Sequence, residues 1–208
     1  MVTLLTPIDR PEFVPLIAQC VLSQTWTDFE WLVIDNSPTP VRDLLPADDR
    51  IRYFRTGHAN IGTLRNFGAQ VATGDAIVHM DADDYSAPTR VATQMERLRV
   101  SGKSVTGYRS LLWWDGLRGG RVRTHVPFAY GTSLCYKREW WLAHPFREIT
   151  FGEDTEFSTM ALAHGELDSI DGGEELVVRV HEGSAIDIRL DNECYLSAEE
   201  LPTLFPRS

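Results

Sequence analysis

The sequence has little of what membrane, secreted or nucleic-acid-binding proteins need. No apolar run approaches a membrane span, no basic tract suits an anionic lipid surface, and the N-terminus does not resemble a signal peptide. The three cysteines, Cys20, Cys135 and Cys194, are odd in number and far apart, which favours a reducing compartment over a disulfide framework or a zinc site. The net charge of −10 disfavours a nucleic-acid partner. We therefore expect a cytoplasmic protein without a transmembrane segment, whose membrane contact, if it has any, is peripheral at the inner face or made through a partner.

What is present is a globular composition with alternating strand and helix patterns. A chain of 208 residues, 43% of them hydrophobic, can bury roughly 70% of its unfolded surface in one large domain. The pattern predicts strands at Val2–Thr6, Trp31–Ile34, Ile51–Phe54, Ala76–Met80, Ser104–Trp114, Arg121–Val126, Ser133–Tyr136 and Leu176–Val180. It predicts helices at Phe13–Ser23, Asn60–Ala72, Pro88–Val100, Arg138–His144 and Thr155–His164. This order favours an α/β fold with a doubly wound, mostly parallel mixed sheet flanked by helices.

Five residues mark the ends and turns of these segments. Asn60 suits a helix N-cap, while Gly74 and Gly102 suit the ends of the helices before them. Asp115-Gly116 suits a turn between two strands.

The most informative segment is an apolar run that ends in three carboxylates. Ile77–Met80 leads directly to Asp81, Asp83 and Asp84. Strands of open α/β sheets build their sites at this end, and Mg²⁺ or Mn²⁺ takes carboxylate oxygens together with phosphates. The segment therefore suits a metal platform for a phosphorylated substrate. An acidic turn is the alternative, because Asp also favours turns and helix N-caps.

Several motifs in order resemble the inverting family 2 glycosyltransferases. The opening of that family is matched by Thr3–Pro7, Arg10–Phe13, Val21–Trp31 and Val33–Ser37, and its later motifs by Asn60–Gly62, Arg65–Gly68, Ala72–Asp75, the DXD-like Asp81–Asp84 and the acidic Gly152–Phe157. The resemblance runs from about Val2 to about Ser184. It implies a GT-A fold: one domain over residues 1–208, with a nucleotide-binding half at about 1–101, an acceptor-side half at about 102–190 and a short tail.

The resemblance also implies roles for single residues. Thr6 would lie beside the nucleobase, Asp35 and Asn36 at the base and ribose, and Arg65 near the base or the diphosphate. Asp81 would reach the ribose or a metal-bound water, while Asp83 and His181 would hold Mn²⁺ or Mg²⁺. Asp154 would be the general base.

The implied donor is a nucleotide-sugar, with a UDP-sugar favoured, and the implied acceptor is a hydroxyl group, as on a glycan or glycolipid. Many members have an acid where this chain has Asn36, and an amide can accept from uracil or donate to another base. The identity of the nucleobase therefore stays open, and so does the question of whether the protein forms a homo-oligomer.

The chemistry of inverting transfer matches these residues independently. A cation offsets the charge of the leaving diphosphate, and a carboxylate beside the acceptor removes its proton. Simpler readings exist for three of them: Asp154 at a helix N-terminus, Arg65 as a solvated cation and His181 as a structural hydrogen bonder.

Two other classes of protein remain as alternatives. A sugar nucleotidyltransferase should have a Gly-rich loop where Thr6–Pro11 stands, and that segment has no glycine. A non-catalytic sugar-nucleotide-binding protein should lack Asp83 or Asp154, and both are present. The pairs Trp113-Trp114 and Trp140-Trp141 suit either sugar stacking or the core.

Overall fold

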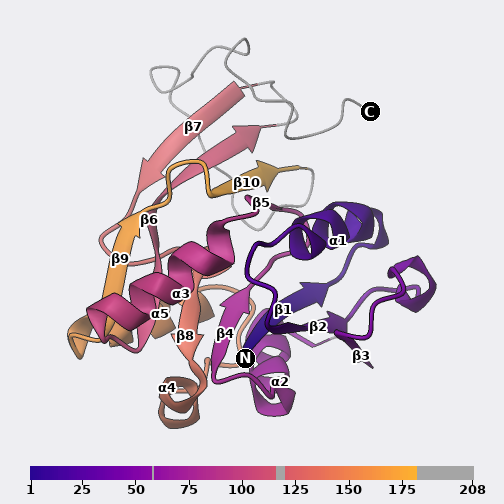
Figure 1. The fold of residues 1–208 in the computed structure, drawn as a ribbon, viewed down its shortest axis with the longest axis horizontal. Helices are drawn as coiled ribbons and strands as arrows, with labels where there is room; N and C mark the ends of the chain where they lie inside the picture. The colour runs from indigo at the N-terminus through magenta and orange to yellow at the C-terminus, as the bar shows by residue number, and fades with distance from the viewer. Residues whose placement is uncertain (58, 116–119, 182–208) are drawn as a thin grey trace.

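The structure is a computed structural model that describes residues 1–57, 59–115 and 120–181. Ten strands form one sheet in the order β3-β2-β1-β4-β8-β6-β10-β5, with β7 and β9 paired to β6. The predicted α/β fold with a mostly parallel mixed sheet is confirmed (Figure 1). The predicted turn at Asp115-Gly116, Cys194 and the C-terminal tail lie wholly or partly outside the described residues.

The first half of the chain builds the parallel part of the sheet. β1 (Val2–Ile8) lies between β2 (Phe29–Asp35) and β4 (Ala76–His79), and β3 (Ile51–Arg55) pairs with β2. All four strands run in the same direction, so their carboxyl ends meet at one edge. The helices between them are α1 (Val14–Leu22), α2 (Ile61–Val71) and α3 (Arg90–Ser101).

The second half continues the sheet with mixed directions. β8 (Cys135–Lys137) lies antiparallel between β4 and the long β6 (Val105–Asp115). Along β6, β9 (Leu167–Asp171) pairs with the first part, while β7 (Gly120–His125) and β10 (Leu176–Val180) pair with the second part. The remaining elements are β5 (Tyr85–Ser86), α4 (Arg138–Ala143), α5 (Glu153–Ala163) and the 3-10 turns Pro11–Phe13 (η1), Arg42–Leu44 (η2) and Gly131–Ser133 (η3).

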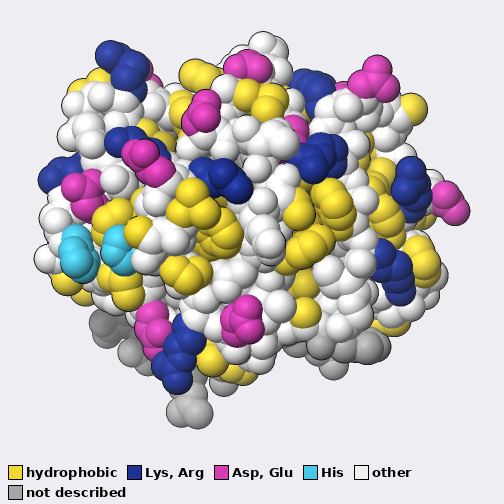
Figure 2. Space-filling view, turned by 90° about the horizontal axis from the view of Figure 1, so that it is seen from below, with side chains coloured by type: hydrophobic (Ala, Val, Ile, Leu, Met, Phe, Trp, Pro, Cys, Tyr) yellow, Lys and Arg dark blue, Asp and Glu magenta, His cyan; other side chains and the backbone are white. Residues whose placement is uncertain are grey.

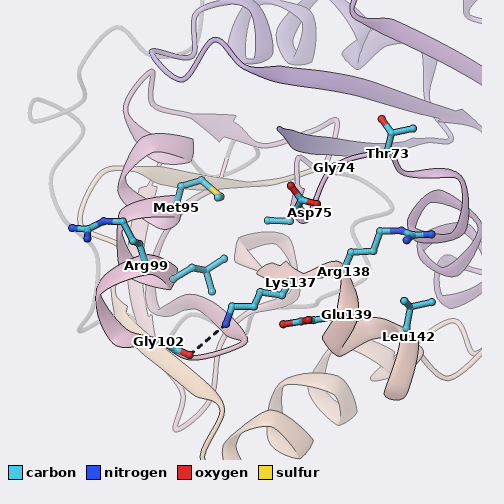
Figure 3. A pocket seen from close by; sticks show the side chains of 12 residues that line it. Thr73, Gly74, Asp75, Met95, Arg99, Gly102, Lys137, Arg138, Glu139 and Leu142 are labelled. Carbon is cyan, nitrogen blue, oxygen red and sulfur yellow. Dashed lines mark hydrogen bonds between the residues drawn. The ribbon is translucent and has the colours of Figure 1, made fainter.

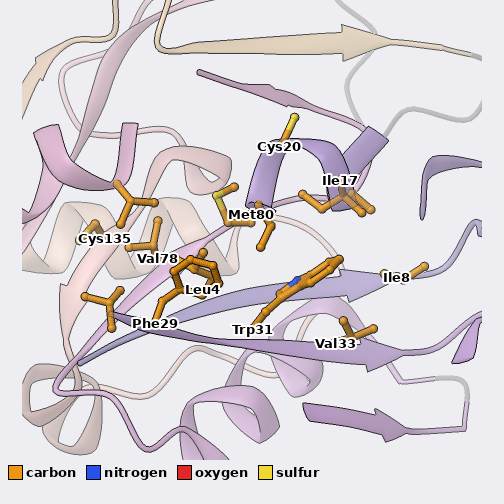
Figure 4. Close-up of a cluster of buried hydrophobic side chains, with 14 of the residues drawn as sticks. Leu4, Ile8, Ile17, Cys20, Phe29, Trp31, Val33, Val78, Met80 and Cys135 are labelled. Carbon is orange, nitrogen blue, oxygen red and sulfur yellow. The ribbon is translucent and has the colours of Figure 1, made fainter. Parts of the chain in front are cut away.

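The core lies on both faces of the sheet because successive strand residues point to opposite sides. Leu4, Trp31 and Val78 pack with α1 and α3 on one face (Figure 4). Leu5, Leu32 and Ile77 pack with α2, α4 and α5 on the other face. Both faces are covered, which explains why these strands are continuous apolar runs in the sequence.

Two helix ends match the sequence and one does not. Asn60 caps α2 by accepting from the Thr63 amide at 2.9 Å, and Gly102 ends α3 at φ 69°. Gly74 does not end α2, whose C-cap is Ala72. A Cβ at Gly74 would lie 2.6 Å from the Thr3 nitrogen, so this glycine permits close packing against β1.

Two strands, β5 and β9, were not predicted from the sequence. The aromatic pairs are largely core: Trp113, Trp140 and Trp141 are 5%, 9% and 8% exposed. Within the described ranges, none of the helices has the length and apolarity to cross a bilayer.

Candidate active site at the carboxyl edge of the sheet

Asp83 and His181 form the candidate metal pair. Asp83 follows β4 and His181 follows β10, and the pairing of β10 with β5 brings the two segments together. His181 Nε2 lies 2.9 Å from Asp83 Oδ2, and Arg10 Nη1 lies 3.3 Å from His181 Nδ1. Both Asp83 and His181 are partly accessible, at 34% and 14% of their side-chain surface. A carboxylate and an imidazole that face the same space suit a divalent cation.

Asp81 supplies a buried oxygen without a partner beside that pair. Its Oδ2 lies 3.5 Å from Arg65 Nη2, whereas its Oδ1 has no hydrogen-bond partner among the described residues. Burial raises the pKa of Asp81, and Arg65 opposes this shift. A buried carboxylate oxygen left unsatisfied is costly unless a ligand or ion completes it. Asp81 therefore fits the predicted contact with a ribose hydroxyl or a metal-bound water.

Asp84 serves a different purpose from Asp83, although it is the adjacent residue. It is 3% exposed, and its carboxylate accepts from Thr132 Oγ1 at 2.5 Å and from the Arg179 amide at 3.1 Å. Burial and the nearby Asp83 raise its pKa well above the ordinary value. Asp83 is thus accessible, and Asp81 has an oxygen without a hydrogen-bond partner among the described residues. Asp84 differs from both, because its buried carboxylate connects the end of β4 to Thr132 and Arg179.

Arg65 connects the donor side of the edge with the start of α5. Its guanidinium forms ion pairs with Asp81 and with Glu153, and the side chain is only 5% exposed. Burial alone would lower the pKa of Arg65, but the two carboxylates outweigh it and raise the pKa. The sequence did not single out Glu153 for this role. Arg65 is therefore a buried cation between two carboxylates, and the simpler interpretation of it as a solvated arginine does not hold.

Asp154 lies beside Glu153 and against the turn η3. Its Oδ1 accepts from the Thr155 amide at 2.7 Å, within the first turn of α5. A Cβ built on Gly131 would fall well inside 3.0 Å of the Asp154 carboxylate, so glycine is the residue that fits there. The backbone of α5 alone therefore does not determine where this carboxylate lies.

The residues predicted to bind the nucleobase are held by the protein's own contacts. Asp35 is fully buried and accepts from Ser37, Val41, Tyr53 and Arg55. Burial alone would raise the pKa of Asp35, but hydrogen bonds from Ser37 and Tyr53 outweigh it and hold the pKa below its usual range.

Thr6 and Asn36 lie at the same edge. The Thr6 hydroxyl is buried and accepts from Trp31 Nε1 at 2.9 Å. The amide of Asn36 contacts the segment after β3, accepting from the Ala59 amide at 3.0 Å and from Thr56 Oγ1 at 3.2 Å, and donating to the Ala59 carbonyl at 3.2 Å. The predicted contacts of Thr6, Asp35 and Asn36 with a base stay predictions.

A hollow of about 600 Å³ lies at the opposite end of the sheet and does not belong to this site (Figure 3). It adjoins Ala76 at the start of β4 and Gly102 at the end of α3. Its arginines are engaged elsewhere: Arg99 pairs with Glu96, and Arg138 donates to the carbonyls of Ala69 and Gln70. On the face seen from below, basic and acidic side chains are scattered between patches of hydrophobic side chains (Figure 2).

Solved structures share this fold at low sequence identity. S. aureus TarS 1-349 in complex with UDP-GlcNAc superposes with a TM-score of 0.69 and 15% identity, covering 88% of this chain and 59% of that chain. The mannosyltransferase PcManGT from Pyrobaculum calidifontis, in complex with GDP-Man and Mn²⁺, gives a TM-score of 0.64 and 15% identity, covering 86% and 56%. The likeness shows the fold.

Curated relatives match over part of their length. An uncharacterized glycosyltransferase of Rickettsia felis is 32% identical over 82 residues, which are 38% of this chain and 14% of that protein. The uncharacterized glycosyltransferase EpsJ of Bacillus subtilis is 32% identical over 94 residues, which are 41% and 26%. The chain therefore matches about a quarter or less of the length of these relatives.

The family assignment rests on a match that covers most of the chain. The profile of glycosyl transferase family 2 matches residues 10–157, from Arg10 beside His181 to the first turn of α5. This range contains the acidic run after β4, Arg65 and Asp154. Most of the residues that converge at the carboxyl edge thus lie within the matched range, with Thr6 and His181 outside it, and the chain belongs to glycosyl transferase family 2.

Proposed function

We propose that this chain is a metal-dependent, inverting glycosyltransferase that moves a sugar from a nucleoside-diphosphate donor to a hydroxyl acceptor. The observation that carries the proposal is the ion-pair network of Arg65. It joins Asp81, next to the Asp83–His181 pair, to Glu153, next to Asp154. A candidate cation site and a candidate base therefore share one edge of the sheet, as in-line transfer between donor and acceptor requires.

The residues at the donor side fit a divalent cation. Among the described residues, no three His, Cys, Asp or Glu side chains enclose a metal by themselves. Mg²⁺ and Mn²⁺ often bind through one or two protein ligands and take the rest from phosphates and water, which suits Asp83, His181 and the unpartnered Asp81 oxygen. When bound, such a cation offsets the charge that develops on the leaving diphosphate.

Asp154 is the acid best placed to accept the acceptor's proton. Glu153 is held in its buried ion pair with Arg65, and Glu156 pairs with Arg147 at 2.8 Å on the exposed side of α5. Asp154 has one oxygen bonded to the Thr155 amide, and its other oxygen faces Gly131. Removal of the hydroxyl proton by Asp154 raises the nucleophilicity of the acceptor oxygen, which then attacks the sugar carbon opposite the diphosphate.

We favour a UDP-sugar as donor and a glycan or glycolipid hydroxyl as acceptor. Support for uridine comes from the fold neighbour TarS, which has been solved with UDP and with UDP-GlcNAc. The GDP-Man complex of PcManGT keeps guanosine as the competing base. For Asn36 to reach a base, its amide must exchange a contact with Thr56 or Ala59 for a contact with the nucleotide.

The decisive experiment measures transfer and donor hydrolysis across UDP-, GDP- and dTDP-sugars with Mn²⁺. We expect one donor to react, and Asp154→Asn to lower the rate by about 10²–10⁴-fold with little change in nucleotide affinity. Glu156→Gln, on the exposed face of the same helix, is the matched control and should keep the rate. If a donor binds tightly but neither transfer nor hydrolysis occurs, the chain is a sugar-nucleotide-binding protein and the proposal fails.

A further inference from the structure

The turn η3 lies directly behind the candidate base. Gly131, its first residue, is packed so closely on Asp154 that no Cβ fits between them. The turn is held by buried polar groups that come from other elements. His79 Nδ1 donates to the Gly131 carbonyl at 2.9 Å, and Gln94 Nε2 donates to the Ser133 carbonyl at 2.5 Å. The position of this turn is therefore imposed from the β4 and α3 side of the molecule.

Arg90 makes the most direct of these connections. It is the first residue of α3 and is 0% exposed. Its Nη2 donates both to the His79 carbonyl at 2.8 Å and to the Thr132 carbonyl at 2.7 Å, while its Nη1 donates to Ser86 Oγ at 2.7 Å. One guanidinium thus joins the end of β4, the segment after the acidic run, and the turn behind Asp154.

This is an unusual use of a buried charge. All the oxygen atoms that accept from Arg90 are neutral: two carbonyls, the Ser86 hydroxyl and the amide oxygen of Gln94. A buried cation without a directly bonded carboxylate carries a large desolvation cost. The planar guanidinium compensates by holding several acceptors in fixed directions, which an ammonium group cannot reproduce.

We propose that Arg90 is a positioning residue that sets the placement of Asp154 relative to the donor-side carboxylates. His79, whose carbonyl it binds, is two residues before Asp81, and Thr132, whose carbonyl it also binds, is next to Gly131. Arg90 therefore fixes the turn against the strand that presents Asp81 and Asp83, and the turn fixes Asp154. Arg90 acts through these residues. The inference rests on the proposed function, in which Asp154 is the base.

The first test compares Arg90→Lys with Arg99→Lys, the same substitution at an exposed position of the same helix. We expect Arg90→Lys to lower kcat by about 10²-fold, because a displacement of about 1 Å at a reacting group costs that much. The affinity for nucleotide with Mn²⁺ should stay within a few-fold of the native value. Arg99→Lys should change neither quantity. A parallel loss of kcat and nucleotide affinity in Arg90→Lys would assign Arg90 a general structural role and overturn the inference.

A double-mutant cycle separates positioning from general destabilisation. If Arg90 acts through Asp154, adding Arg90→Lys to Asp154→Asn should lower the residual rate no further, because residues that act as a unit are not additive. Equal fold losses in both backgrounds would contradict the inference.

The variant Gly131→Ala tests the contact between the turn η3 and Asp154 without altering Arg90, so it can be used if Arg90→Lys does not fold. Its Cβ must displace the Asp154 carboxylate, so kcat should fall while nucleotide binding survives. A native rate in Gly131→Ala would overturn the inference.

The failure of the proposed function would look different from the failure of this inference. If the native chain transfers no sugar, the proposed function fails, and the placement is then read from crystal structures of the native protein, Arg90→Lys and Gly131→Ala. A shift of the turn and of Asp154 away from β4 in Arg90→Lys supports the positioning role, and an unchanged placement overturns it. Where Arg90→Lys does not fold, a displaced Asp154 carboxylate in Gly131→Ala supports the role, and an unchanged one overturns it.

Discussion

His181 Nε2 lies 2.9 Å from Asp83 Oδ2, although 98 positions separate the two residues in the chain. The contact forms because β10 pairs antiparallel with the two-residue strand β5, just after the acidic run. The candidate cation site thereby includes the residue that follows β10, the last strand that the structure describes, and its assembly depends on both halves of the chain.

Removing Asp83 should abolish Mn²⁺-dependent nucleotide binding without unfolding the protein. The side chain is 34% exposed, so we expect Asp83→Asn to change the free energy of unfolding by no more than about 0.5 kcal/mol. Loss of a metal-site group should weaken nucleotide affinity in Mn²⁺ by at least about 10–100-fold. Calorimetry with and without Mn²⁺ measures the effect. Asp84→Asn is the matched control and should retain Mn²⁺-dependent binding; equal losses in the two variants would contradict the division between these carboxylates.

Exchanging the amide at position 36 should change the choice of base. Asn36→Asp removes the donor that now bonds the Ala59 carbonyl and leaves only acceptors. A carboxylate can accept from the imino N–H of uracil but not from the unprotonated ring nitrogen at that position of cytosine, so the thermal shift with UDP should rise relative to that with CDP. If Asn36→Asp gives the same thermal shifts as the native chain with all nucleoside diphosphates, Asn36 does not contact the nucleobase.

Arg65 should matter for stability as much as for binding. Arg65→Met leaves Glu153 buried without its cation, which should cost about 3–5 kcal/mol in the free energy of unfolding. Adding Glu153→Gln removes the stranded charge and should recover a large part of this loss. Urea unfolding of the native chain, both single variants and the double variant gives the coupling. If the losses in the free energy of unfolding of the two single variants add up in the double variant, the Arg65–Glu153 ion pair makes no specific contribution to stability.

Asp35 should make stability depend on pH in the acidic range. Its pKa in the folded protein lies below the ordinary value near 3.9, so its contribution to stability is fully present above about pH 4 and disappears as the pH falls through the lower folded pKa. Asp35→Asn should destabilise the fold by about 1–3 kcal/mol near neutral pH, because the buried carboxylate that accepts hydrogen bonds from Ser37, Tyr53 and the exposed Arg55 becomes a neutral amide.

The gap between native protein and Asp35→Asn should narrow as the pH falls below about 4. Unfolding in urea across pH 2.5–7 would reveal it. Asp28→Asn, at a carboxylate that is 72% exposed, serves as the control. A gap that does not change with pH would refute this role of the Asp35 charge.

The strands and caps that the sequence specifies locally could be predicted. Apolar runs such as Trp31–Ile34 and Ala76–Met80 mark strands covered on both faces, and Asn60 and Gly102 mark helix ends whose backbone chemistry is local. β9 has the polar sequence Leu167–Asp171 and is a strand only because it pairs with β6. Its pairing is a tertiary effect that no local pattern carries.

For the candidate site, the positions of the carboxylates at strand and helix ends could be predicted from the sequence, whereas the burial of the arginines could not. Asp81, Asp83 and Asp154 stand at strand or helix ends, where function concentrates, and sequence reasoning located them there. Asp84 cannot be told from Asp83 in sequence, because only the approach of Thr132 and the Arg179 amide buries one of the two. Arg65 and Arg90 likewise resemble surface arginines until the helices that carry them are packed. Their partners, such as Glu153 for Arg65, are distant in the chain.

The position of β8 in the sheet determines how long one edge of β4 stays unpaired during synthesis of the chain. β8 lies between β4 and β6, so the apolar edge of β4 remains open until residue 137 has been synthesised. An open, buried-type strand edge is a template for pairing with other chains. A fragment that ends after α3, at about residue 101, would carry the whole parallel core and yet expose that edge, and it should aggregate. We therefore expect that the predicted nucleotide-binding half cannot be produced or transplanted alone.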